Sequence, residues 1–370
     1  MTAPLNLHRC SLLALIASLA CSGSGETLID GAVDTVPPDT AVDAGCDASW
    51  RREVLATGDV SVQNAITIDA SGGIHIARYD RGTATIVYTT NVSGTWSSET
   101  VATLTDPGLP DPAIVVDSVG HVDVAHLDRR GRDVWFATRA TPTWMSTPIE
   151  TNTPGATSLD MVVGRDGVVR VAYDRTITAG VRLAIRASTT WQVTTVDGTD
   201  VIGDVAVIDS PPGKTTVAYR RLSPPAVMVA SDASGAFSPI PLPFDGAFAN
   251  LGRAPNDDVL LAYTREPSGE LGYSLYTGGT WTHYPTGVVV DYVHDVATLR
   301  DGSFAVLYRA TAGRELRLGT VRGGQLTSEP IDAVGDAGLS AGIATHGAEI
   351  HIAYRREGAQ PELVHAWTCR

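Results

Sequence analysis

Lysine is almost absent from this chain, since Lys214 is the only one among its 370 residues. Charged residues make up only 18% of the sequence, and the formal net charge at pH 7 is -14. Six acidic residues lie between positions 22 and 50, a stretch without lysine or arginine. No basic stripe of the kind that binds phosphate backbones is present. We therefore do not expect nucleic acid as a partner.

Long apolar runs are also missing, apart from one near the N-terminus. Residues 12–20 are apolar but too few to cross a bilayer as a stable helix. His8 and Arg9 precede this run and Cys21 follows it. A positive start, a short apolar stretch and small residues before a cleavage point are typical of a secretory signal peptide, which we predict for residues 1–20.

Residues 18–21, Ser-Leu-Ala-Cys, resemble the lipobox of bacterial lipoproteins, in which the cysteine becomes the lipidated first residue. The resemblance implies that Cys21 carries a lipid and that the protein is anchored in the bacterial cell envelope, at the outer membrane. A periplasmic or secreted protein is the alternative. Residues 21–45, rich in Gly, Pro, Thr and Asp, are predicted to form a disordered acidic tether, so the lipid is the only membrane contact we expect.

From residue 65 onward one pattern recurs. It consists of an apolar strand, a turn with Asp or Gly, a second strand with a small residue before tyrosine, a third strand and a Gly-rich turn into an aromatic. Repetition at this period is typical of propellers and solenoids. We predict an all-β fold over residues 46–370, a seven-bladed β-propeller of four-stranded antiparallel blades. The small residues that give the register, 44 to 48 positions apart, are Ala77, Ala125, Ala172, Ala218, Ala262, Leu307 and Ala353.

The residue that opens each fourth strand gives an independent register: Trp96, Trp144, Trp191, Phe237, Trp281 and Leu326. The seventh copy ends before its own aromatic, but Trp50 and the residues after it align with Trp96 and its successors. We therefore predict that the N-terminal strand completes the last blade and closes the ring, which removes both free sheet edges. The alignment also brings Cys46 close to Cys369 and predicts a disulfide, with two independent thiols as the alternative.

Residues 71–77, Ser-Gly-Gly-Ile-His-Ile-Ala, and their counterparts resemble the repeats of bacterial exported propellers related to sialidase Asp-box repeats and to fucose-specific lectins. The resemblance covers residues 50–370 and implies the propeller fold. The sialidase repeat has a tryptophan after its Asp-x-Gly core, and no turn of this chain has it. Sialidase activity is therefore not implied.

The loops after the second strands hold the candidate binding site. Each copy has at least one arginine there and most have a tyrosine, on the face opposite the tether, which suits carboxylates, sugar rings or peptide ends. The alternative is that the arginines only pair with Asp80, Asp128 and Asp174 on adjacent blades. The expected binding residues are Tyr79, Arg81, Arg129, Tyr173, Arg175, Tyr219, Arg221, Tyr263, Arg265, Arg309, Tyr354 and Arg356.

Catalytic and metal sites are not expected. The histidines have neither metal-ligand spacing nor an adjacent nucleophile, and no turn offers the several oxygen ligands that Ca²⁺ requires. We predict a monomer without cofactor, metal or catalytic residues that binds a glycan or protein partner at the cell surface. The alternatives are an envelope scaffold used only for protein contacts and a glycan-cleaving enzyme of sialidase-like or lyase type.

Overall fold

The computed structural model describes residues 48–370, except for residues 107, 109, 129, 131, 141, 153, 154, 176–179, 200 and 202 and the side chains of residues 61 and 62. The chain separates into two units, Met1–Gly45 and Cys46–Arg370. The predicted signal peptide, Cys21, the tether and Cys46 lie outside the described residues. Within the described ranges, no helical segment has the length and apolarity to cross a bilayer.

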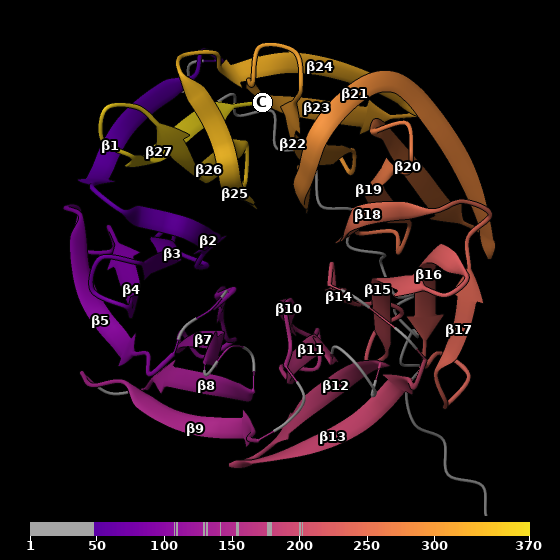
Figure 1. Ribbon diagram of the computed structural model, residues 1–370, viewed down its shortest axis with the longest axis horizontal. Helices are drawn as coiled ribbons and strands as arrows, with labels where there is room; N and C mark the ends of the chain where they lie inside the picture. The colour runs from indigo at the N-terminus through magenta and orange to yellow at the C-terminus, as the bar shows by residue number, and fades with distance from the viewer. Residues whose placement is uncertain are drawn as a thin grey trace, which may run out of the picture. The chain divides into compact units, whose positions relative to one another are not determined.

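The described residues form an all-β structure in which consecutive strands pair in antiparallel sheets around a central axis (Figure 1). The first three sheets contain β2 (Val60–Ile68), β3 (Ile74–Asp80), β4 (Thr85–Thr90) and β5 (Ser97–Thr103); β6 (Ala113–Val116), β7 (Val122–Asp128), β8 (Asp133–Arg139) and β9 (Met145–Glu150); and β10 (Leu159–Val163), β11 (Val169–Arg175), β12 (Gly180–Ala187) and β13 (Thr190–Asp197). The next contains β14 (Ala206–Asp209), β15 (Thr215–Leu222), β16 (Pro225–Ser231) and β17 (Ser238–Pro241).

A seven-stranded sheet follows, made of β18 (Gly246–Arg253), β19 (Val259–Arg265), β20 (Glu270–Thr277), β21 (Thr280–Thr298), β22 (Phe304–Ala310), β23 (Leu316–Arg322) and β24 (Gln325–Asp332). The long strand β21 pairs with β20 through its first part and with β22 through its second part. This sheet therefore consists of two four-stranded arrays that share β21. The last sheet contains β25 (Asp336–His346), β26 (Glu349–Glu357), β27 (Glu362–Cys369) and β1 (Arg51–Thr57).

Each four-stranded array is a blade of a β-propeller, and its first strand lies nearest the axis (Figure 1). The second strands are buried on both sides because side chains alternate between the two sheet faces and each face packs against a neighbouring blade. The small residues of the repeat all lie in these strands, and each is fully buried. The register predicted from the sequence is therefore confirmed.

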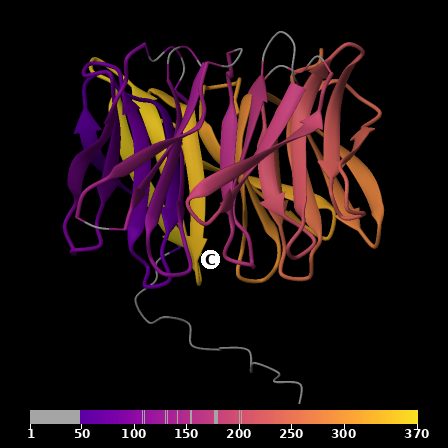
Figure 2. The ribbon, with the colours of Figure 1, turned by 90° about the horizontal axis from the view of Figure 1, so that it is seen from below.

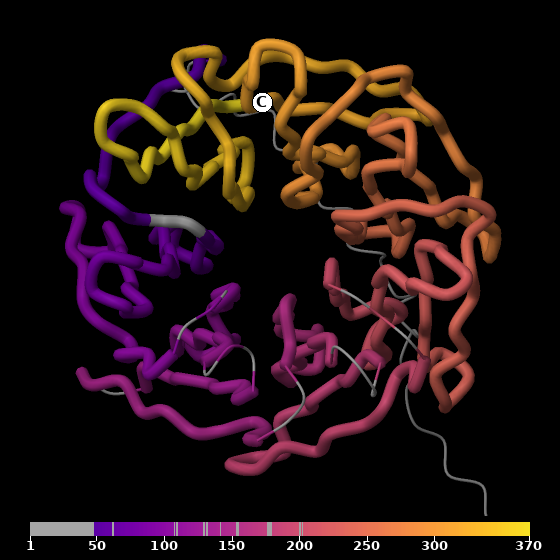
Figure 3. The backbone as a smooth tube through the Cα atoms, in the orientation of Figure 1, coloured from indigo at the N-terminus to yellow at the C-terminus, as the bar shows by residue number. Residues whose placement is uncertain are grey.

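The first described strand, β1, pairs with the last strand, β27, in antiparallel register from Arg51 opposite Trp367 (Figure 3). It also takes part in a contact that recurs between neighbouring outer strands, in which an indole Nε1 donates a hydrogen bond to a glutamate. The three contacts are Trp96 to Glu53 at 2.9 Å, Trp144 to Glu99 at 3.0 Å and Trp50 to Glu329 at 3.3 Å. The segment after Trp50 thus interacts as the other outer strands do.

Two buried histidines join β1 to the strands beside it. His365 Nδ1 lies 2.9 Å from Glu53 Oε1 on β1, and His351 Nδ1 lies 3.0 Å from His365 Nε2. Burial lowers the pKa of His365 to about 4 and lowers the pKa of His351 as well. Both rings are therefore neutral near pH 7. In the contact between them, the N–H of one ring donates to the unprotonated nitrogen of the other.

The propeller has two faces, at opposite ends of its strands (Figure 2). The turn face carries the turns between the first and second strands, which are residues 69–73, 117–121, 164–168, 210–214, 254–258, 299–303 and 347–348. Asp and Gly shape these turns: Asp69 Oδ1 accepts from the amide of Gly73 at 2.9 Å, and Gly72 has a φ of 86°. The opposite end, which carries the turns between second and third strands and the links between blades, is the loop face.

Candidate functional site

The tyrosines predicted to bind a ligand do not reach the surface. Their exposed fractions are 4% for Tyr79, 0% for Tyr173, Tyr219 and Tyr354, and 1% for Tyr263. Tyr173, Tyr219, Tyr263 and Tyr354 directly follow the small residue of their strands, so they point to the opposite sheet face, which packs against the preceding blade. Tyr79 lies two residues after Ala77 and packs with it against the next blade. The predicted role of these five tyrosines as ligand contacts is therefore wrong.

Three of these tyrosines instead connect neighbouring blades. Their hydroxyls donate to a carboxylate at the end of the preceding blade's outer strand, and burial, together with that carboxylate, raises the tyrosine pKa well above its usual value. The pairs are Tyr173 to Glu150 at 2.6 Å, Tyr219 to Asp197 at 2.7 Å and Tyr354 to Asp332 at 2.5 Å. Tyrosine after the small residue is a packing feature of this repeat.

The predicted arginines are also distributed rather than gathered. Several are held by carboxylates or carbonyls: Arg175 by Glu150 at 3.7 Å, Arg265 by Glu270 at 3.1 Å, Arg356 by Asp332 at 3.0 Å, Arg221 by the carbonyl of Pro224 at 3.2 Å, and Arg309, which is buried, by Asp291 and Asp336. Arg81 is exposed, and Arg129 lies outside the described residues. Most of the described arginines are therefore engaged by other groups of the propeller.

The three aspartates named in the alternative interpretation make contacts within their own strand and with the backbone. Asp80 pairs with Arg78 of its own strand at 3.5 Å. Asp128 and Asp174 accept hydrogen bonds from backbone amides of the links between blades, as in the contact from Thr157 to Asp174 at 2.7 Å. Carboxylates at the end of the second strand therefore fix the inter-blade links.

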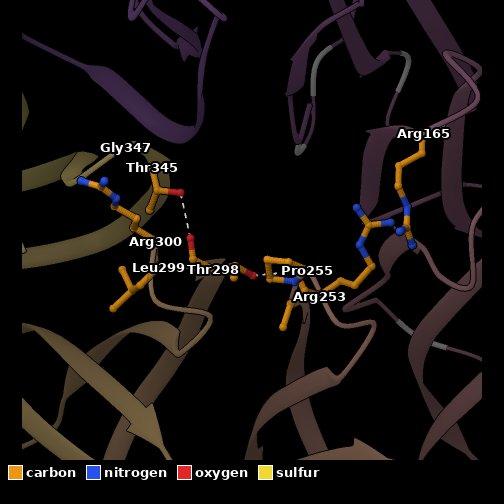
Figure 4. A pocket seen from close by; sticks show the side chains of 9 residues that line it. Arg165, Arg253, Pro255, Thr298, Leu299, Arg300, Thr345 and Gly347 are labelled. Atoms are coloured by element: carbon orange, nitrogen blue, oxygen red, sulfur yellow. Dashed lines mark hydrogen bonds between the residues drawn. The ribbon is translucent and has the colours of Figure 1, made fainter. Parts of the chain in front are cut away.

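Two cavities open along the axis. The one on the turn face has a volume of about 560 Å³ and is lined by Arg165, Arg253 and Arg300 among others (Figure 4). Arg165 and Arg253 are both held by the buried Asp209, at 3.4 and 3.1 Å, and Arg165 also pairs with Asp257. Two of the three arginines in this lining are therefore held in a structural ion-pair cluster with two carboxylates.

The cavity toward the loop face has a volume of about 590 Å³ and a different lining. The inner strands and the links that enter them supply it, so it receives side chains from every blade. No arginine or lysine occurs among its described lining residues. The polar and aromatic groups that line it are Asp111, Asp160, Asp204, Asp295, Gln63, Asn64, Asn250, Ser158, Ser340, Phe248, Tyr292 and His294.

Three of these aspartates join one inner strand to the next. Their Oδ2 atoms accept hydrogen bonds from backbone amides of the following blade: Asp111 from Leu159 at 2.8 Å, Asp160 from Val207 at 2.8 Å and Asp295 from Ile343 at 3.0 Å. Desolvation raises the pKa of Asp111 to about 7, of Asp160 to about 6 and of Asp295 to about 7. The three residues are half-buried, and all three line the cavity.

The backbone is strained where it enters the cavity. Asp111, Asp204 and Phe248 have φ values of 41°, 55° and 53°, a left-handed conformation that residues other than glycine rarely adopt. All three occupy the same position in their blades, two residues before the partner of the small residue. Strained backbone persists where surrounding structure enforces it, and it is frequent at functional sites.

Two aromatic side chains lie at the same end of the cavity. The rings of Phe248 and Tyr292 have centroids 5.1 Å apart and are nearly perpendicular, and His294 lies 5.8 Å from Tyr292. Burial lowers the pKa of His294 to about 4, so this ring is neutral near pH 7. Carboxyl, amide and aromatic groups thus meet in one concave site.

Little in the sequence indicates this site, because its residues are not repeated. Equivalent positions hold different residue types, such as Asp111, Asp204 and Phe248. The sequence signal that could have indicated this site is the change of residue type at equivalent positions, at or just before the start of the otherwise regular inner strands.

Solved structures with a similar fold include a protein of unknown function from Dyadobacter fermentans DSM 18053, with a TM-score of 0.53, 13% identity, and coverage of 87% of this chain and 99% of that one. The Aleuria aurantia lectin, described as a six-bladed β-propeller with a novel fucose recognition mode, has a TM-score of 0.52 and 12% identity over 75% of this chain and 96% of its own. Kuenenia stuttgartiensis hydrazine synthase has a TM-score of 0.59 and 10% identity over 82% and 94%.

No protein-family model matches the chain, and no curated protein matches it by sequence. At 10 to 13% identity the structural similarities establish the fold alone. The chain is a β-propeller.

Proposed function

We propose that this protein is a non-catalytic binding protein of the bacterial cell envelope whose loop-face cavity holds a glycan. The observation that carries this proposal is the placement of Phe248 and Tyr292 beside the carboxyl and amide groups of one cavity. The apolar face of a sugar ring packs on aromatic rings, while its hydroxyls form hydrogen bonds with carboxylates and amides. The volume of about 590 Å³ is typical of small-molecule sites.

The fold of the Aleuria aurantia lectin adds support, since the description of that protein names fucose recognition by a β-propeller. We propose a glycan without acidic groups, because the described lining of this cavity has four aspartates and no cation. Such a lining offers no cationic partner to a sugar that carries a carboxylate.

Glycan cleavage is the second candidate, and the raised pKa values of Asp111 and Asp295 favour it, because a carboxyl group with a pKa of about 7 can act as a general acid. However, Asp295 accepts backbone hydrogen bonds on both oxygens, from Val296 at 2.7 Å and Ile343 at 3.0 Å. These bonds fit a role in joining blades. A scaffold that makes only protein contacts would bind no glycan at all.

We further propose that the propeller has seven blades and is closed by β1. Two four-stranded arrays share β21, and β1 occupies the outer position beside β27. The contacts of Trp50 with Glu329 and of Glu53 with Trp96 place β1 between two neighbouring outer strands, as closure requires. Six blades, the number described for the Aleuria aurantia lectin, would leave one of these arrays unaccounted for.

The proposed cellular location rests on the sequence. We propose residues 1–20 as a signal peptide, Cys21 as the lipidated residue, residues 21–45 as a tether, and a monomeric propeller from residue 46. The disulfide between Cys46 and Cys369 belongs to the same proposal, and it is supported by the assignment of Cys369 as a disulfide cysteine. An oxidising compartment suits such a bond.

A glycan array probed with the purified protein tests the proposed function. We expect binding to a defined set of uncharged or amine-bearing glycans, and we expect Phe248→Ala to abolish it while the circular dichroism spectrum stays unchanged. Arg221→Ala is the matched control, because Arg221 lies on the loop face outside the cavity. Loss of binding in Arg221→Ala but not in Phe248→Ala would contradict the cavity as the site, and no binding to any glycan would contradict glycan recognition.

A further inference from the structure

The loop-face cavity brings four aspartates together without an arginine or lysine among its described lining residues. Asp160 interacts electrostatically with Asp111 and Asp295, and each interaction raises the pKa of the affected carboxyl after the larger effect of desolvation. These side chains come from three different blades, yet they share one electrostatic field. Arg309 lies near Tyr292, with its Cζ atom 6.0 Å from the ring centroid, but it is committed to two other carboxylates.

The same cavity contains a buried acceptor that lacks a donor. His294 forms a hydrogen bond with the backbone of Gly338 that favours the protonated ring, so the ring donates its N–H to the carbonyl. A neutral imidazole that donates through one nitrogen presents the other as an acceptor. The Nε2 atom is buried and has no hydrogen-bond partner among the described residues. This nitrogen is also closed to solvent, so a ligand in the cavity meets the aspartates that line it and not this atom.

We propose that the ligand of this cavity carries a protonated primary amine, as an amino sugar does. This inference rests on the proposed function, because it names the class of glycan that the cavity takes. An ammonium group offers three donors and no acceptor, which complements the oxygens of the aspartates that line the cavity. Each carboxylate oxygen that accepts one backbone amide retains capacity for a second donor.

The aromatic pair is compatible with the same ligand. The faces of Phe248 and Tyr292 attract a cation as well as the apolar side of a sugar ring. A quaternary amine has no N–H, and an acetylated amine keeps one N–H but has no charge, so each keeps the ring contacts and loses charge-assisted hydrogen bonds to the carboxylates. Discrimination between an amine and its acetylated form therefore measures the carboxylate contribution directly.

Isothermal titration calorimetry of the purified protein near pH 7 tests this inference with glucosamine, N-acetylglucosamine and glucose. At this pH the free amine is largely protonated. Loss of a charge-assisted hydrogen bond weakens binding by roughly tenfold to a hundredfold, so we expect glucosamine to bind tighter than both analogues by about that factor. We expect the preference to shrink in 0.5 M salt only in part, since a cavity is screened less than a surface.

Asp204→Asn and Asp160→Asn are the informative variants, and we expect each to reduce the preference for glucosamine. Asparagine tolerates the left-handed backbone at position 204, so that variant is expected to fold. Asp301→Asn is the matched control, because Asp301 lies on the turn face and pairs with Arg322. It should leave the preference unchanged.

The outcomes separate the two proposals. Equal binding of the three sugars, or an unchanged preference in both cavity variants, would overturn the amine inference and leave glycan recognition in place. Glycan-array binding confined to glycans without an amine would do the same. Absence of binding both on the array and in calorimetry would overturn the proposed function and the inference together.

Discussion

The tyrosine after the small residue is predicted to stabilise the propeller and to leave ligand binding unaffected, which the variant Tyr219→Phe tests. Tyr219 is fully buried, and its hydroxyl donates to Asp197 Oδ2 at 2.7 Å across the boundary between two blades. The substitution removes one oxygen and keeps the ring. The remaining hydrogen bond described for Asp197 comes from the amide of Thr199 at 2.9 Å.

The expected loss follows from the type of hydrogen bond. A bond from a neutral donor to a charged acceptor contributes about 1.5 to 3 kcal/mol, and Asp197 is 8% exposed, so water replaces the lost donor poorly. We therefore expect the free energy of unfolding to fall by about 2 kcal/mol. Tyr263→Phe is the matched control. Its hydroxyl receives only a long bond from Ser274 at 3.4 Å, so the loss should stay under about 1 kcal/mol.

Equilibrium unfolding in urea, followed by tryptophan fluorescence, measures both variants on the same scale. The double variant with Asp197→Asn should show a coupling energy of about 1 to 3 kcal/mol, because the two residues are in direct contact. Equal losses for Tyr219→Phe and Tyr263→Phe would refute the inter-blade contact as the cause. A Tyr219→Phe protein of normal stability that no longer bound its glycan would refute the assignment of the tyrosine to packing.

Two further predictions concern protonation. In ¹³C NMR the carboxyl of Asp295 should titrate with a midpoint of about 7, and a midpoint near 4 would contradict this. Because the folded pKa is raised above the unfolded value of about 3.8, this carboxyl stabilises the fold fully below pH 3.8, and the stabilisation is lost as pH rises through about 7. His365 shows the opposite sign, since its folded pKa of about 4 lies below the unfolded value of about 6.5, so its contribution is lost as pH falls through that range. Hydrogen exchange, corrected for intrinsic rates, should show β1 losing protection at pH 5 relative to pH 7.5 while β19 does not; equal protection of β1 at both pH values would contradict this.

The architecture was largely predictable because each blade repeats the same packing problem. The small residues and the aromatic positions recur at a nearly constant spacing; the small residues lie in the second strands, and the aromatic positions lie at the start of the outer strands or one residue before it. The strand after Trp50 was predictable for the same reason, as it preserves both the tryptophan and the glutamate three residues later. Regular contacts between equivalent surfaces leave a regular pattern in the sequence.

The candidate site was not predictable in the same way. Tyr173 and Tyr219 recur because they connect blades, and their recurrence was mistaken for a binding ring. The strand period could have indicated their burial, since both faces of a second strand are covered. The cavity residues share a position and not a residue type, so no periodic pattern marks Asp204 or Phe248. Only the ring of blades brings them together.

The position of a bound glycan can be observed in a crystal structure of the protein with its tightest array ligand. We expect electron density for a sugar inside the loop-face cavity, in contact with Phe248 and Tyr292 and within hydrogen-bond distance of the cavity aspartates. Density for the sugar between the outer parts of neighbouring blades, with the loop-face cavity holding only solvent, would contradict the proposed site.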